Sequence, residues 1–202
     1  MISICGDNSH NQLSKISNNK NAQGKYFIDP PLKLPIDPSL IKSYSICFSN
    51  SIIITCRNTI YGIGNNMHYS ISTSLPRQII TDFTEFKIRD ADNLIMKPIS
   101  VLCCGIFSIF IVLSSADDLP QLVIEFENNN GRPLFLDLNG RYPVSLYNGE
   151  PHIAGVIDNK NEIILIKYDY QTSSSEMSFS VPNRSYSLPF NEKAVSLAFC
   201  AC

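Results

Sequence analysis

The stretch TIYGIGNN (59–66) holds two glycines and two asparagines in a spacing that could cradle a phosphate. A dinucleotide-binding loop needs G-x-G-x-x-G, a helix that begins there and an acidic residue about 20 positions later. After Gly62 and Gly64 the chain continues NNMHYSISTSLPRQ, with no third glycine and no amphipathic stripe. We therefore interpret the stretch as structural: Gly64 permits a close approach of strand and turn, and Asn66 bonds to its own backbone.

The cysteines are the next candidates for chemistry. Neither the Cys103-Cys104 pair nor the Cys200-x-Cys202 pair has the C-x-x-C spacing of a structural zinc site, so packing in the core is the favoured role. The acidic turn DNKNE (158–162) is too short for a calcium loop. The sequence offers no Ser-His-Asp or Cys-His arrangement for nucleophilic catalysis. We predict no catalytic residue, no metal and no cofactor, and hence that the chain is not an enzyme.

Composition limits the class of partner. The chain has 202 residues, 44% hydrophobic and 17% charged, with a net charge of -2, which is typical of a globular domain. Nucleic-acid binders concentrate Lys and Arg, and no basic run is present, so neither nucleic acid nor a membrane surface is an expected partner. The start MISICGDNSH lacks the features of a secretory signal, and seven cysteines form an odd set. We expect reduced thiols and a cytoplasmic or nuclear location.

One uncharged segment has nearly the length of a membrane span. It is PISVLCCGIFSIFIVLSSA (98–116). Its β-branched and aromatic residues suit strands, and two buried strands joined by a turn near Cys104 and Gly105 explain it equally well. The first interpretation predicts one membrane-spanning helix, and the second predicts one buried hairpin.

Two segments share a pattern around glycine and asparagine. CGDNSHNQL (5–13) aligns with IGNNMHYSI (63–71) as G-[DN]-N-x-H-x-x-[LI]. His10 and His68 occupy the same position, which favours a turn or packing role over a ligand pair. We predict a structural role, in the turns of a repeat, for five residues: Gly6, Asn8, Gly64, Asn66 and Gly105.

A longer periodicity organises the whole chain. IIITCRNTIYGIG (52–64) and GVIDNKNEIILIK (155–167) both read as strand, polar turn and strand, and 108–126 has the same plan. Short strands that recur with a period of about 50 residues predict an all-β fold of β-propeller blades. We expect one domain, 1–202, with about four repeats in an incomplete or open propeller. The expected repeats are 1–39 (partial), 40–97, 98–142, 143–193 and 194–202 (the start of the next).

These repeats resemble those of the regulator of chromosome condensation family. LCCGIFSIFIVLS (102–114) is similar to the first half of the family repeat, ITCRNTIYGIGNNMHYSI (54–71) to its second half and CGDNSHNQLS (5–14) to its tail. The chain departs from the family in having no Trp; Cys5 and Ile63 stand where the family has one. The resemblance implies a seven-bladed propeller of roughly 350 residues, so we expect a piece of a longer protein or a truncated product.

The resemblance also suggests the function. A propeller presents loops on a rigid frame, which suits recognition of a protein partner through the blade-connecting loops. The primary hypothesis is a non-enzymatic protein-interaction scaffold. The alternative is a guanine-nucleotide exchange factor for a Ran-like small GTPase, the activity of the family's founding member.

Overall fold

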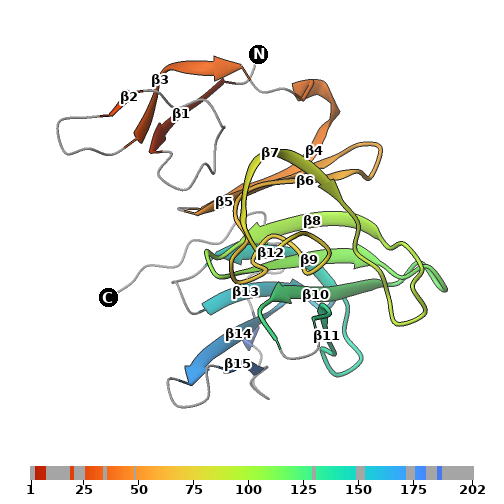
Figure 1. Ribbon diagram of the computed structural model, residues 1–202. Helices are drawn as coiled ribbons and strands as arrows, with labels where there is room; N and C mark the ends of the chain where they lie inside the picture. The colour runs from red at the N-terminus through yellow and green to blue at the C-terminus, as the bar shows by residue number, and fades with distance from the viewer. Residues whose placement is uncertain are drawn as a thin grey trace.

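The computed structural model describes residues 3–7, 19–20, 26–33, 36–47, 49–128, 131–148, 153–171, 176–180 and 186–187. Apart from one short 3-10 helix, η1 (Pro38–Leu40), the regular structure of these residues is antiparallel β-sheet (Figure 1). The predicted all-β class is confirmed.

The strands form four sheets that follow one another along the chain. The first sheet has the order β1-β3-β2 and contains β1 (Ser3–Asp7), β2 (Asn19–Lys20) and β3 (Tyr26–Lys33). Blade 1 contains β4 (Ile41–Ile46), β5 (Asn50–Thr55), β6 (Ile60–Asn65) and β7 (Ile79–Phe86). Blade 2 contains β8 (Lys97–Cys103), β9 (Phe107–Leu113), β10 (Pro120–Phe126) and β11 (Leu134–Leu136). Blade 3 contains β12 (Pro143–Asn148), β13 (Ile153–Asp158), β14 (Glu162–Gln171) and β15 (Glu176–Ser180), and β16 (Tyr186–Ser187) also pairs with β14.

Each blade is a meander in which successive strands are neighbours, the plan of a propeller blade. The strands of the first sheet lie within 3–33, those of blade 1 within 41–86, those of blade 2 within 97–136 and those of blade 3 within 143–187. The repeat bounds given above stay predictions. The predicted start of a further repeat at 194–202 lies outside the described residues.

The repeat also shows in the details of the backbone. The first strand of every blade has a register irregularity at the same place, between Ile41 and Ser43, Pro98 and Ser100, and Pro143 and Ser145. The turn between the second and third strands places one residue in the left-handed region in each blade: Asn58 (φ 60°), Asp118 (φ 54°) and Asn161 (φ 62°). Asn and Asp tolerate this conformation best among residues with a side chain.

The hydrophobic core lies between the blades. In β9, Phe110 and Val112 belong to the cluster shared with Ile52 and Ile54 of blade 1. The alternate residues Ile109 and Ile111 point to the opposite face and join the cluster shared with blade 3. Blade 2 is therefore buried on both faces, which favours the nearly continuous apolar sequence of β9.

This burial explains the membrane-like segment 98–116. It forms β8 and β9, joined by a turn at Cys104 to Ile106, as one of the two interpretations predicted. Among the described residues no helix is long and apolar enough to cross a membrane.

Candidate functional site

Because Gly64 has no side chain, the backbone of blade 1 can approach it more closely than it could approach any other residue. It lies in β6, next to a register irregularity, with φ +111°. A Cβ atom there would lie 2.4 Å from the Ser49 carbonyl oxygen and 2.7 Å from Asn50 Cα. Both neighbours are backbone atoms, so they cannot move aside cheaply.

Gly6 and Gly105 occupy different environments. Gly6 lies in β1, paired with Ile28, so Gly6 and Gly64 lie in strands rather than in turns as predicted. The reason is that each glycine sits at a register irregularity near the end of its strand, one or two residues before the strand stops. Gly105 does lie in a turn, between β8 and β9, with φ +84°. Asn8 lies outside the described residues.

The Gly105 carbonyl joins blade 2 to blade 1. It accepts hydrogen bonds from Ser49 Oγ (3.0 Å) and Asn50 Nδ2 (3.1 Å), and both donors are buried. The glycine turn therefore presents a backbone acceptor to the preceding blade.

Asn66 organises the loop that follows β6, residues 66–78, which we call the Asn66 loop. Its side chain is fully buried, and its oxygen accepts from the backbone N–H groups of Ile71 (2.9 Å) and Ser72 (3.1 Å). Its nitrogen donates to the carbonyl groups of Ser72 and Pro76, both at 3.0 Å. The Asn66 side-chain amide thus bonds to backbone groups of the loop that would pair with a neighbouring strand in a sheet.

Glu125 is the most unusual ionisable group near this loop. It lies in β10 of blade 2, is 1% exposed, and accepts hydrogen bonds from Thr73 N (2.8 Å) and Ser72 Oγ (3.3 Å) of the Asn66 loop. Burial raises the pKa of its carboxyl group to about 7, against the lowering effect of these bonds. The carboxyl group therefore titrates near neutral pH at the junction between two blades.

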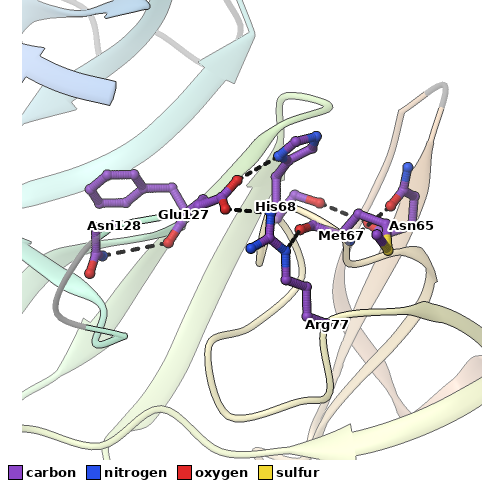
Figure 2. A network of polar contacts seen from close by, with 8 residues as sticks. Asn65, Met67, His68, Arg77, Glu127 and Asn128 are labelled. Carbon is purple, nitrogen blue, oxygen red and sulfur yellow. Dashed lines mark hydrogen bonds and ion pairs between the residues drawn. The ribbon is translucent and has the colours of Figure 1, made fainter. Parts of the chain in front are cut away.

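Glu127 forms a second junction, shown in Figure 2. Its carboxylate contacts His68 Nδ1 (2.7 Å) through one oxygen and Arg77 (2.5 Å) through the other. Arg77 Nε also donates to the Met67 carbonyl at 2.6 Å. His68 is therefore part of an inter-blade polar network, and the described residues contain no group of three or more side chains placed to hold a metal ion.

A cleft of about 880 Å³ lies beside these junctions, lined by residues of the Asn66 loop, of the segment 87–93 and of blade 2 within 125–128 and 131–135. Its apolar wall includes Phe126, Leu134 and the half-exposed Phe135. Three exposed cations of the lining are Lys87, Arg89 and Arg132.

These cations are available to a ligand. Arg89 donates to the Asn93 carbonyl (2.8 Å), but among the described residues none of the three forms an ion pair. The Asp90 carboxylate in the same cleft is already bonded, to Ser115 Oγ (2.7 Å) and the Leu94 N–H (2.8 Å). The cleft therefore combines an apolar wall with three exposed cations, and the Asp90 carboxylate also lies in its lining.

The chain matches no protein-family model and no curated protein. Solved structures do match: 33 chains are similar, among them human WBSCR16, with a TM-score of 0.61 and 10% sequence identity. That match covers 98% of this chain and 50% of the WBSCR16 chain, so this chain spans about half the length of that protein. WBSCR16 is of propeller type, and the sheets of this chain are propeller blades that form no closed barrel within the described residues.

Sequence reasoning missed the blade 2 counterparts of these residues. Gly64 pairs with the first residue of β5, Asn50, and Phe126 pairs with the first residue of β9, Phe107. Asn66 lies two residues after Gly64, and Asn128 likewise lies two residues after Phe126. Asn128 Nδ2 donates to the Arg132 carbonyl at 2.7 Å and thus braces its own loop. The signal in the sequence was an Asn two residues after the end of an apolar strand, but the glycine of the pattern is replaced there by Phe126.

Proposed function

We propose that the chain is a diverged member of the regulator of chromosome condensation repeat family and acts as a non-enzymatic protein-interaction scaffold. The observation that carries this proposal is the cleft beside Glu125, because the buried Asn66 and Glu125 hold the loop on one side of it and Asn128 braces the loop on another. Loops on a rigid frame are suited to recognition, since little conformational entropy is lost when they bind.

The partner that fits this cleft is an extended protein segment with acidic and apolar side chains. Lys87 and Arg89 are alternate residues separated by the buried Ile88, so both project from the same side of the chain into solvent. Acidic groups of a ligand can pair with them and with Arg132, while apolar groups cover Phe135 and Leu134. Location in the cytoplasm or nucleus, where the thiols stay reduced, is part of the proposal.

Selection from a displayed library of random peptides tests this function. We expect wild-type protein to enrich peptides that combine Asp or Glu with Leu, Ile or Phe. The variant Lys87→Glu/Arg89→Glu/Arg132→Glu should lose this enrichment, because charge reversal repels the same ligands.

A matched control changes the same amount of charge elsewhere. Arg57→Glu/Lys97→Glu/Lys160→Glu replaces three exposed cations that do not line the cleft. The control should select the same peptides as wild type. Failure of wild type to enrich any acidic class, or equal enrichment by both triple variants, would reject the cleft as the binding site.

A further inference from the structure

Cys47 and Cys103 lie at the C-terminal ends of the first strands of neighbouring blades. Cys47 directly follows β4, and Cys103 ends β8. The Cys103 N–H donates to Ser45 Oγ (2.8 Å), and its thiol donates to the Ser45 carbonyl (3.4 Å). Exposure alternates along β4, so Ser45 and Cys47 point to the same side, toward β8. Cys47 packs against the core cluster that contains Cys103.

The two thiols differ in environment. Cys103 is 1% exposed and belongs to the core cluster, whereas Cys47 is only partly buried at the edge of that cluster. As a thiol, Cys47 donates to Asn50 Oδ1 at 3.1 Å. A small oxidant can therefore reach Cys47 from solvent, whereas Cys103 is buried in the core.

The protonation states of the pair support different chemical roles. The neighbouring Cys103 thiol and the N–H groups of Ser49 and Asn50 lower the pKa of Cys47 to about 6, against the effect of burial. Burial raises the pKa of Cys103 well above its usual range. At neutral pH Cys47 is the nucleophilic thiolate and Cys103 remains a thiol.

We propose that Cys47 and Cys103 form a peroxide-oxidisable site, in which a hydroperoxide converts the pair into a disulfide between blades 1 and 2. The site is independent of the binding cleft, which these two residues do not line.

The chemistry takes two balanced steps. The Cys47 thiolate attacks one oxygen of the hydroperoxide; the O–O bond breaks, Cys47 becomes a sulfenic acid, and the leaving group departs as hydroxide or alkoxide. The Cys103 sulfur then attacks the Cys47 sulfur, an S–S bond forms, and the sulfenic oxygen leaves as water with the Cys103 proton. The hydroperoxide is the oxidant for both steps, and each disulfide consumes one hydroperoxide.

The test uses the full chain treated with one equivalent of hydrogen peroxide at pH 7, alkylation of the remaining thiols and peptide mass spectrometry. We expect a cross-linked peptide pair, lighter by two hydrogens, that joins Cys47 to Cys103. Cys56, an exposed free thiol, is the internal control and should react at least about 10-fold more slowly.

Because Cys104 is adjacent to Cys103, single variants are needed to show which of the two cysteines forms the disulfide with Cys47. Cys104→Ser and Cys56→Ser should leave the cross-link intact, and Cys103→Ser should abolish it. Because Cys103→Ser is a core substitution, circular dichroism must show that this variant folds; if it does not, fragmentation of the wild-type cross-linked peptide distinguishes Cys103 from Cys104. A cross-link from Cys47 to any other cysteine, oxidation of Cys56 before Cys47, or a stable Cys47 sulfinic acid without a cross-link would overturn the proposal.

Discussion

The Glu125 carboxylate of blade 2 accepts the backbone N–H of Thr73 in blade 1 at 2.8 Å, in a site where Glu125 is only 1% exposed. The same carboxylate accepts from Ser72 Oγ. A buried acid thus connects two successive blades beside the cleft.

The first prediction concerns the pH dependence of stability. Because the pKa of Glu125 is raised to about 7 in the folded state, the folded state binds a proton more tightly than the unfolded state. The contribution of Glu125 to stability should be complete below about pH 4.5 and should fall as pH rises to about 7, by about 3 kcal/mol.

The variant Glu125→Gln isolates this contribution, since Gln can still accept from Thr73 N and can donate to Ser72 Oγ. Urea unfolding at several pH values should show that the variant gains stability relative to wild type between pH 5 and 8. A constant difference across this range would show that Glu125 does not titrate there.

The sequence predicted the blades but not the contacts between them. Short apolar segments and turn residues such as Asn58 are local features, and local features predicted the hairpins 52–64 and 155–167. The roles of Glu125 and Glu127 could not be predicted from the sequence, because they depend on Thr73 and Arg77, which are more than 45 residues away in the chain. Only the stacking of the blades brings these groups together.

The second prediction concerns Gly64. Gly64→Ala places a methyl group against the Ser49 carbonyl and fixes an unfavourable φ, so it should destabilise the fold by more than about 3 kcal/mol. Gly140→Ala is the control, because φ there is +74° but no atom lies within 4 Å of the added Cβ; it should cost about 1 kcal/mol. Equal losses in urea unfolding would mean that the close approach to Ser49 does not matter.

The third prediction concerns Asn66. Asn66→Ala removes the side-chain acceptor of two backbone N–H groups and the donor to two carbonyl groups of the Asn66 loop, and should cost about 3 kcal/mol or more. The neighbouring Asn65 has an exposed side-chain bond to Met67 N (2.8 Å), and Asn65→Ala should cost about 1 kcal/mol or less. Hydrogen exchange should show loss of protection at Ile71 and Ser72 in the Asn66 variant alone. Protection that survives there would contradict the bracing role.

The fourth prediction separates the scaffold from nucleotide exchange. The resemblance to the repeat family rests on turn and core residues, and no exchange residues can be placed on this chain. We expect that excess protein will not accelerate the release of labelled GDP from Ran. Release faster than the intrinsic rate would favour the exchange-factor alternative.

The most direct test of the scaffold is the affinity of the acidic peptides recovered by selection. Fluorescence anisotropy should give a dissociation constant at least about 10-fold weaker for Lys87→Glu/Arg89→Glu/Arg132→Glu than for wild type. The Arg57→Glu/Lys97→Glu/Lys160→Glu variant should bind like wild type. Equal affinity for wild type and the cleft variant, or equal weakening by both triple variants, would contradict a binding role for the cleft.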